Sequence, residues 1–534
     1  MITKTAKPTY SLSSAPRIFA ASVLILLIFL GCALRFSRLG FADYWENEAN
    51  GAQVLSGIDA NQMRDELANK TVTFGSLFER YQSRNPTATL DSMMKVLITS
   101  HSGHAPGYYT LLFFWTGWFD SHRATTRQLS ALLSLLQLPA LFFLVLELFG
   151  SPLLAFLSVC IFALSPFQLL YAQEVSEYSL FAACACLVNL CLLRALRKHG
   201  IFDWLIYMVA TTASLIVSVN TAYLLLAHGL IVLVEERPQL KSGSVIFSRS
   251  LLLWIAAITL AAAIISPYIY IVVQHMIAMG STGLEFLSTK TTATNLLSGW
   301  ADVLISPFYA LGSVKTLIPL KLLLAILSMA AIFFTALVGQ GRSRTLLLST
   351  AIVPFLCLFI PDVGLGGFRS TLPKYIMSVP ISLTIMIAFM FFKPLESKRT
   401  KALWRLFTGG ALTALLLLEI GCCIKILSER QHAYMSEGFD TIADIISADK
   451  KCLVLSQEQP SLMNIHQLLC LSHIVDPAAR LMWLDNPDEL VLPEKTSHFY
   501  VYNAPDSLVY LLGTYGYKFQ PQKKVWYFDR VDTP

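Results

Sequence analysis

Acidic residues gather in one short segment directly after the first long apolar run of the chain. Asp43, Glu46 and Glu48 lie within six positions of one another in the sequence GFADYWENEAN, beside Tyr44 and Trp45. A carboxylate near a bilayer is costly unless it has water, a partner or a function, and it can take a proton from a hydroxyl or an amine. The segment therefore predicts a watered cavity where a membrane helix ends, with general-base chemistry as a candidate role.

Further polar groups lie where other apolar runs begin or end. They are His104, Tyr108 and Tyr109; Gln173, Glu174, Glu177 and Tyr178; and Arg369 with Lys374. Arginine and lysine can hold a departing phosphate, and aromatic rings can pack against a sugar. Each residue taken alone also has an ordinary explanation as a solvated acid, an interfacial ring or a snorkelling cation. Only the ordered set, on one face of a helical bundle, indicates an enzyme.

The composition shows what kind of scaffold must position these groups. The 534-residue chain is 55% hydrophobic and only 14% charged, whereas a soluble domain carries about 25% charged residues. Its net charge of +6 lies mostly in short connecting segments and forms no basic stripe interleaved with aromatic residues. We therefore expect an integral membrane protein in contact with the bilayer, and we exclude nucleic acid as a partner.

Long apolar runs supply the membrane helices. They lie at about 18–36, 106–119, 128–149, 152–170, 177–194, 202–219, 221–234, 250–273, 316–338, 345–361, 375–392 and 404–427. A helix needs about 20 residues to span a bilayer, so the shorter runs must be tilted, kinked or re-entrant. The pattern predicts an all-α polytopic membrane bundle of about 11–13 transmembrane helices.

Positively charged residues set the expected orientation of this bundle. Lys4, Lys7 and Arg17 precede the first apolar run, which is long enough to span and lacks a good cleavage site. We interpret that run as an uncleaved membrane helix, with residues 1–17 in the cytoplasm. The segments expected on the outer face are 37–104, 274–315, 362–374 and 428–534.

The C-terminal segment, 428–534, is soluble in character and predicts a small extracytoplasmic α/β domain. KCLVLS, RLMWLD and SHFYVYNA are typical of short strands, and SLVYLLGTYG predicts a helix that ends at glycine. Cys452 and Cys470 both lie here and either form a disulfide or remain two free thiols. The expected division is thus a bundle over 18–427, which includes the outer loop 37–104, followed by this domain.

The chain also resembles a known family over residues 35–195, the membrane-embedded glycosyltransferases of the C-type superfamily. The resemblance is to glycosyltransferase family 39 in particular, the group of the protein O-mannosyltransferases and the lipid A aminoarabinose transferases. The family motifs are matched, in chain order, by Trp45-Glu46-Asn47-Glu48-Ala49, His104-Ala105-Pro106-Gly107-Tyr108-Tyr109, Arg127 with Ser130 and Ser134, Leu148-Phe149-Gly150, Tyr171-Ala172-Gln173-Glu174-Val175-Ser176-Glu177-Tyr178 and Lys374-Tyr375-Ile376.

Three positions depart from the family pattern. Lys374 replaces an arginine of the family, which keeps the charge but loses the bidentate fork. The aspartate of the family motif Trp-x-Asp-Glu-Ala is Asn47 here, and an amide cannot accept the acceptor's proton. The family carries an arginine after Gln-Glu-Ala, and this chain has Ser176 and Glu177 in that part of the motif instead. The resemblance then implies Glu48 as the first candidate for the general base and Glu46 as the second.

The resemblance implies a transferase that moves a sugar from a polyprenyl-phosphate donor to a glycan, lipid or protein acceptor, with inversion at the anomeric carbon. We expect it in the bacterial inner (plasma) membrane, acting at the outer face. Arg369 and Lys374 are the candidates for holding the lipid phosphate. The candidates for contacting substrate are Asp43, Trp45, Asn47, His104, Tyr108, Tyr109, Gln173, Glu174 and Tyr178.

Two other functions and one cofactor question stay open at this stage. A transporter or flippase of a lipid-linked precursor would carry ionisable residues at mid-bilayer depth and often inverted repeats, whereas here the acids lie at helix ends. A catalytically lapsed relative, acting as an assembly partner, would explain Asn47. No cofactor is certain, because clustered carboxylates suit Mg²⁺ or Mn²⁺ but their spacing specifies neither.

Overall fold

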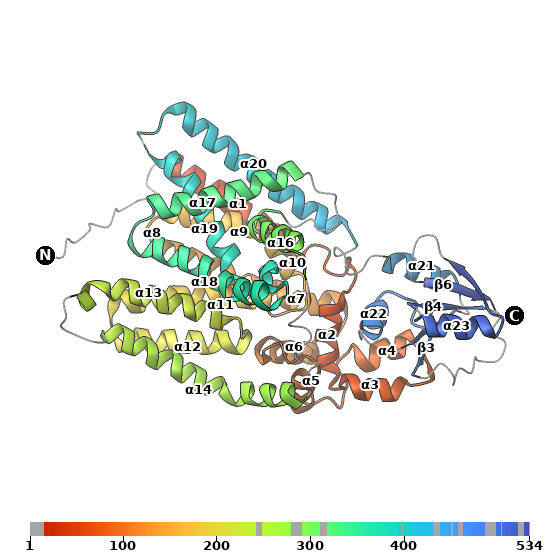
Figure 1. Ribbon diagram of the computed structural model, residues 1–534. Coiled ribbons are helices and arrows are strands. Elements are labelled where there is room, and N and C mark those ends of the chain that lie inside the picture. Colours follow the sequence, from red (N-terminus) through yellow and green to blue (C-terminus); the bar gives the residue numbers. More distant parts are fainter. Residues whose placement is uncertain are drawn as a thin grey trace. The chain divides into compact units, whose positions relative to one another are not determined.

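The computed structural model of the chain divides into two compact units (Figure 1). The bundle unit comprises residues 1–37, 104–108 and 130–426, and the loop-and-sheet unit comprises 38–103, 109–129 and 427–534. The first loop therefore belongs to the same unit as the C-terminal segment. The residues that the structure describes are 15–241, 248–278, 291–309, 318–397, 399–430, 438–449, 452–457, 463–485, 498–503, 505–521 and 528–532.

The bundle unit is almost entirely helical. Its elements are α1 (Ala15–Phe36), α8 (Gln137–Phe149), α9 (Pro152–Leu164), α10 (Pro166–Ala172), α11 (Tyr178–Lys198), α12 (Ile201–Val217), α13 (Thr221–Lys241), α14 (Arg249–Ala278), α16 (Ala293–Ile305), α17 (Ile318–Val338), α18 (Gly341–Leu365), the 3₁₀ turns η1 (Arg369–Thr371) and η2 (Pro373–Ile376), α19 (Ser378–Glu396) and α20 (Ala402–Ser428). Two further helices, α6 (Pro106–Trp118) and α7 (Arg123–Ser134), contribute residues to both units.

The helices confirm the predicted membrane bundle. Among the described residues, eight helices are long and apolar enough to cross a membrane, counting α7 with α8 as one, and up to nine if the bent pair α9 and α10 is a single span. That pair bends by 62° where Ser165 caps the start of α10 and Pro166 is its first residue, since proline suits a first helical position. Two shorter apolar helices lie at 201–217 and 221–235.

Burial distinguishes central from peripheral spans. In α11 and α19, 78% of the 18-residue apolar stretch of the helix is buried inside the protein. These helices are apolar almost all round. In α1 only 11% is buried, and Leu26 and Phe29 are among its exposed side chains. In a membrane these side chains would face lipid tails.

The loop-and-sheet unit has a six-stranded sheet with strand order β1-β3-β2-β4-β6-β5. Its elements are α2 (Glu46–Ser56), α3 (Ala60–Leu67), β1 (Lys70–Thr73), α4 (Phe74–Tyr81), α5 (Leu90–Ser100), α21 (Phe439–Ala448), β2 (Leu453–Gln457), α22 (Met463–Leu471), β3 (Arg480–Leu484), β4 (His498–Tyr502), α23 (Asp506–Thr514), β5 (Lys518–Pro521) and β6 (Phe528–Asp532). Strands β3, β2 and β4 run parallel, and the outer pairs are antiparallel.

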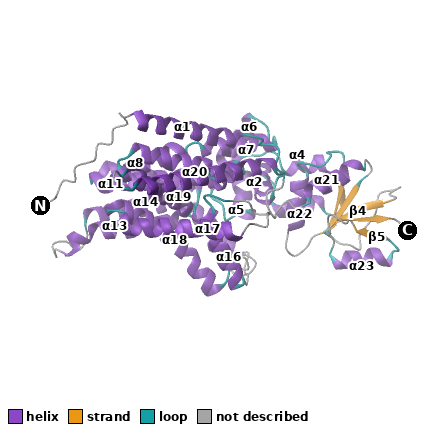
Figure 2. Cartoon of the chain, turned by 90° about the horizontal axis from the view of Figure 1, so that it is seen from above, coloured by secondary structure: helices purple, strands orange, loops and turns teal. Residues whose placement is uncertain are grey.

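The sheet confirms the predicted C-terminal α/β fold and adds a strand from the first loop. Helix α23 lies beside the strands (Figure 2), and its Leu508 and Leu512 pack with the buried residues of β2, β3 and β4. Strand β1 pairs with β3 although 406 residues or more separate them in the chain. Cys452 and Cys470 are both buried in the described part of the unit, and neither forms a disulfide.

Candidate active site

The first-loop acids are organised around one buried ion pair in the loop-and-sheet unit. Glu48, in the first turn of α2, accepts hydrogen bonds from Arg127 Nε at 2.7 Å and from Arg127 Nη2 at 2.6 Å, one on each carboxylate oxygen. Both side chains are almost completely buried. Such a two-pronged pair fixes orientation as well as charge. Both oxygens of Glu48 are therefore engaged by a partner.

Arg127 also holds the chain that leads into α2. Its Nη1 donates to the carbonyl oxygens of Leu39 and Ala42, each at 2.9 Å, and its Nη2 donates to that of Asp43 at 3.0 Å. One guanidinium on α7 thus organises the whole turn between residues 39 and 48. The sequence comparison matched Arg127 to a family motif but gave it no role in the site.

Asp43 differs from Glu48 in having no such partner. Its side chain is completely buried, and neither carboxylate oxygen has a hydrogen-bond partner among the described residues. Burial raises the pKa of Asp43 to about 6, although the charges of Arg430, Arg123 and Arg127 act to lower it. A carboxyl group with such a pKa can change its protonation state close to neutral pH.

The other predicted residues of this segment lie at the start of α2. The backbone N–H of Trp45 donates to Glu48 Oε2 at 3.4 Å, and Asn47 occupies the first turn, partly exposed. Glu46 Oε1 lies 3.9 Å from Nδ1 of His466. Burial lowers the pKa of His466 to about 4, helped by the charge of Arg64, so this histidine is neutral at pH 7. The structure thus brings Asp43, Trp45, Glu46, Asn47 and Glu48 into one turn.

A histidine from the C-terminal segment supports this turn, and sequence reasoning missed it. The His473 ring packs on Tyr44, with ring centroids 4.0 Å apart, and its Nε2 lies 3.0 Å from Oε1 of Gln82. Burial, with the charges of Arg123 and Arg127, lowers the pKa of His473 well below its usual value. The neutral ring donates from Nε2, because Gln82 Nε2 itself donates to the carbonyl oxygen of Ala49.

A second polar cluster lies in the bundle unit around His104. Its Nδ1 lies 2.8 Å from Oε1 of Glu177, and Tyr268 donates its hydroxyl to the carbonyl oxygen of His104 at 2.6 Å. Burial acts to lower the pKa of His104, but the charge and hydrogen bond of Glu177 outweigh it, so the pKa is raised overall. The pKa of Glu177 is lowered, because His104 more than offsets the effect of burial. Glu177, at the position near which the family has arginine, is therefore the anion that favours the protonated form of His104.

Lys374 and Arg369 lie on neighbouring turns of the same unit but have different surroundings. Lys374 Nζ lies 5.4 Å from the ring centroid of Tyr178 and 5.4 Å from that of Tyr375, within range of a cation–π contact. Its charge also acts on His104 and Glu177.

Arg369 is tied into its own loop. It donates from Nε to Asp362 Oδ1 at 3.2 Å, and the second oxygen of that buried carboxylate accepts the backbone N–H of Ser370 at 2.6 Å. Of the two predicted phosphate ligands, Lys374 is thus the one grouped with His104, Glu177 and Tyr178.

The remaining candidates of the bundle unit and α6 are buried. Tyr108 and Ser130 share a hydrogen bond between their hydroxyl oxygens at 2.7 Å, and Tyr109 is also buried. Gln173 Nε2 donates to the carbonyl oxygens of Leu34, Arg35 and Ser37, at 3.2, 3.2 and 2.8 Å. Leu34 and Arg35 lie in the last turn of α1 and Ser37 directly follows it, so Gln173 holds the end of this helix. The negative charge of Glu174 acts on His104.

The described residues contain no group of three histidine, cysteine, aspartate or glutamate side chains placed to hold a metal ion. In the turn at 43–48, both oxygens of Glu48 accept hydrogen bonds from the guanidinium of Arg127. This arrangement does not fit a divalent cation bound by Glu48. We therefore assign no chemical step to a metal ion.

Comparisons with known proteins agree with this architecture. A family model described as dolichyl-phosphate-mannose-protein mannosyltransferase matches residues 103–271. ArnT from Cupriavidus metallidurans in the apo state is 13% identical, with a TM-score of 0.57 over 96% of this chain and 98% of that one. The same enzyme bound to undecaprenyl phosphate is 14% identical, with a TM-score of 0.54 over the same shares. No curated protein sequence matches the chain. The chain therefore has the fold of the C-type membrane glycosyltransferases, the superfamily that its sequence resembles.

Proposed function

We propose that this chain is an integral membrane glycosyltransferase that moves a hexosyl or pentosyl group from a polyprenyl-phosphate donor to an acceptor at the outer face of the membrane. The observation that carries the proposal is the turn at residues 43–48. That turn holds two buried carboxylates: Asp43, which has no hydrogen-bond partner among the described residues, and Glu48, which is paired with Arg127. The matching family model and the fold support the same class of reaction.

The cationic cluster of the bundle unit suits the lipid-phosphate part of the donor. Glu177 raises the pKa of His104, so His104 is protonated more readily than an ordinary histidine and, once protonated, adds a positive charge to that of Lys374. Two cations can stabilise the charge that develops on the departing phosphate. We propose His104 and Lys374 as the principal phosphate ligands and Arg369 as an outer one, since its Nε already binds Asp362.

The acidic turn suits activation of the acceptor. In the proposed step the acceptor's O–H or N–H proton passes to a carboxylate of the turn, and the freed lone pair forms a bond to the anomeric carbon. The bond from that carbon to the phosphate oxygen breaks, and its electron pair leaves with the polyprenyl phosphate. Attack opposite to the leaving group inverts the anomeric configuration.

Asp43 is the preferred carboxylate for this proton. A general base needs an available lone pair and a pKa near the working pH. The pKa of Asp43 is about 6, whereas both oxygens of Glu48 already accept hydrogen bonds from Arg127. We propose that Glu48 acts as a positioning residue that holds Arg127 and thereby the turn. The sequence-based prediction that Glu48, or else Glu46, accepts the proton remains the rival assignment.

The decisive assay uses purified protein in detergent, where transport across a membrane has no meaning. We expect release of polyprenyl phosphate from a radiolabelled polyprenyl-phosphate sugar, together with transfer of the label to a mixture of cell-envelope glycans, lipids and proteins. If purified protein binds the donor without turnover, while vesicles containing it move the donor across the bilayer, the transporter function is favoured instead. If the protein shows neither transfer nor transport, the catalytically lapsed relative becomes the better explanation.

A further inference from the structure

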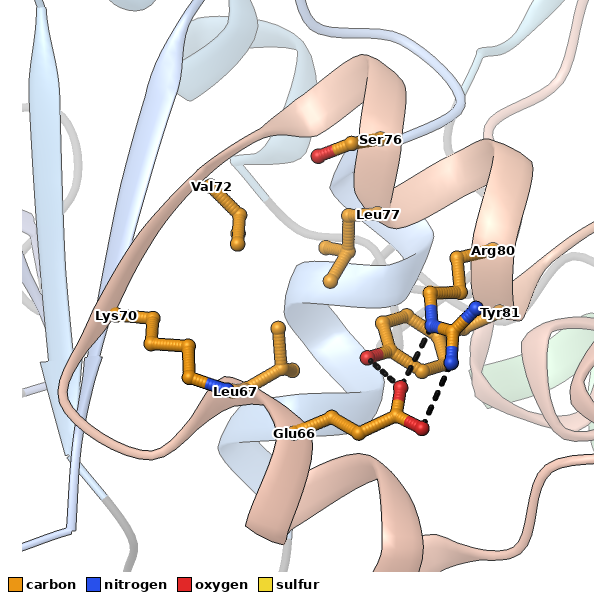
Figure 3. Close-up of a pocket in the computed structure, with 8 residues that line it drawn as sticks. All are labelled: Glu66, Leu67, Lys70, Val72, Ser76, Leu77, Arg80 and Tyr81. Carbon is orange, nitrogen blue, oxygen red and sulfur yellow. Dashed lines mark hydrogen bonds and ion pairs between the residues drawn. The ribbon is translucent and has the colours of Figure 1, made fainter.

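The loop-and-sheet unit contains a pocket that the proposed reaction does not use. It has a volume of about 430 Å³ and lies between α3, β1 and α4 (Figure 3), within the range of ligand sites, roughly 300–1,000 Å³. Its lining residues are Glu66, Leu67, Lys70, Val72, Ser76, Leu77, Arg80 and Tyr81.

One wall of this pocket is fixed by a hydrogen-bonded carboxylate. Glu66 accepts from Arg80 Nε at 2.6 Å and Nη2 at 2.7 Å, and from the hydroxyl of Tyr81 at 2.8 Å. The hydrogen bond from Arg80 is the main reason that the pKa of Glu66 is lowered to about 2. Glu66 therefore stays charged and paired at any physiological pH, and the wall is already formed before a ligand arrives.

The floor of the pocket is apolar. Leu67 and Leu77 are buried, and Val72 lies on the opposite side from Arg80 and Tyr81 (Figure 3). An aliphatic or aromatic side chain placed there would be stabilised by about 25 cal/mol for each Å² of apolar surface removed from water.

The rim carries a positive charge. Lys70 is exposed and forms no ion pair with the residues that the structure describes, while the charge of Arg80 is balanced by Glu66. The lining therefore has an excess of one cation, which favours a ligand with an anionic group beside its apolar part.

Among the described residues, no strand pairs with the outer edge of β1, the strand beside the pocket. Strand β1 is the last strand of its sheet. The backbone bond from Phe74 N to the carbonyl oxygen of Ala479 continues the β1–β3 register. This register makes Val72 and Phe74 the residues whose backbone groups face β3, so the N–H and C=O of exposed Thr71 point the other way. An extended peptide can pair with such an edge and place alternate side chains in a neighbouring pocket.

We propose that this pocket binds an extended peptide segment in which an apolar residue is flanked by acidic ones. The apolar side chain occupies the floor formed by Leu67, Val72 and Leu77, the carboxylate meets Lys70, and the peptide backbone pairs with Thr71. This site is independent of the proposed glycosyl transfer, because it requires neither the donor nor the acidic turn.

The test is fluorescence anisotropy with the purified full-length chain and a labelled peptide, Thr-Asp-Leu-Glu-Val-Thr. We expect saturable binding below about 1 mM. Lys70→Glu should weaken it by about tenfold or more, and Val72→Trp should weaken it similarly by filling the floor. Lys95→Glu, a matched charge reversal on the exposed face of α5, should bind like the unaltered chain.

Two outcomes would overturn the proposal. The first is absence of saturable binding up to about 1 mM. The second is binding that Lys70→Glu and Val72→Trp leave unchanged while thermal unfolding shows both variants to be folded. A peptide in which lysine replaces both acidic residues serves as the specificity control and should bind at least about tenfold more weakly.

Discussion

Two carboxylates that lie five positions apart in the first loop, Asp43 and Glu48, differ in their hydrogen-bond partners. Glu48 has both oxygens bound to Arg127, and Asp43 has neither oxygen bonded among the described residues. Sequence reasoning chose Glu48 because the comparison with the family was made position by position. The partner of Glu48 lies on α7, 79 residues away in the chain, and no local pattern reveals it.

Replacement of Asp43 tests this separation of roles. Asp43→Asn should lower kcat/KM by about 10²–10⁴-fold, the usual contribution of a general base. A second change, Asn47→Asp in the same protein, restores a carboxylate at the position where the family carries one and should recover part of the activity. A purely structural role for Asp43 predicts no such recovery.

The rival assignment is tested by Glu48→Gln. An amide keeps the size of the side chain but loses the ion pair, so we expect a less stable protein with a loss of activity that stabilising conditions partly reverse. If Glu48→Gln abolishes transfer in a fully folded protein while Asp43→Asn is as active as the unaltered enzyme, Glu48 is the base.

The pH dependence of activity follows from the two clusters. A base with a pKa of about 6 must be deprotonated to act, so kcat/KM should fall as the pH drops below that value. His104 must be protonated to hold phosphate, so activity should also fall at alkaline pH. Because Glu177 raises the pKa of His104, Glu177→Gln should move this alkaline fall in activity to lower pH. A rate profile that does not vary from pH 5 to 9 would contradict both assignments.

Asp43 also has a consequence for stability. Its pKa is raised from 3.8 to about 6 in the folded protein, so between these values the folded state binds more protons than the unfolded state. The free energy of unfolding should therefore fall as the pH rises through this window. Asp43→Asn removes the cost of burying a charged carboxylate and should increase the free energy of unfolding at pH 7 by up to about 3 kcal/mol. Thermal unfolding of this variant and of the unaltered chain at pH 4 and pH 7 measures the effect.

At the scale of elements, the ion pair between α2 and α7 is the main connection inside the first loop. Arg127→Ala leaves Glu48 buried without its partner, which should cost about 3–5 kcal/mol of stability. Combining it with Glu48→Gln removes the unpaired charge and should cost less than the sum of the two single changes. Additive effects in this double-mutant cycle would show that the pair contributes little.

A similar argument applies to the end of α1. Gln173 supplies the donor for three carbonyl oxygens there, so Gln173→Ala should destabilise the bundle by about 1–3 kcal/mol. Gln173→Glu, which lacks the amide donor, should destabilise it at least as much. Substrate affinity measured in the folded fraction should remain close to normal, since this side chain is engaged with α1.

The helices and the C-terminal strands were predictable from sequence for physical reasons. A run such as 177–194 is apolar on every face and has no other stable state in a bilayer, and it forms α11. The short apolar segments KCLVLS and SHFYVYNA form β2 and β4, which are buried on both faces. The pairing of β1 with β3 was not predictable, because a four-residue strand in a polar loop carries no signal of its distant partner.

At the scale of the whole molecule, the first loop and the C-terminal segment form one unit. Deleting residues 429–534 should therefore do more than remove a peripheral domain. It removes β3, the partner of β1, and His473, which packs on Tyr44. We expect the truncated chain to insert in the membrane but to lose transfer activity and to expose the first loop to protease.

The central claim is that the chain transfers sugar from a polyprenyl-phosphate donor by means of the acidic turn at residues 43–48. Its most direct test is the single-turnover release of polyprenyl phosphate by purified protein, comparing the unaltered chain, Asp43→Asn, and Asp43→Asn combined with Asn47→Asp. We expect the unaltered chain to release polyprenyl phosphate and Asp43→Asn to lose this activity. The double variant should recover part of it. Donor binding without turnover by the unaltered chain, under conditions where it is folded and supplied with acceptor, would contradict the account.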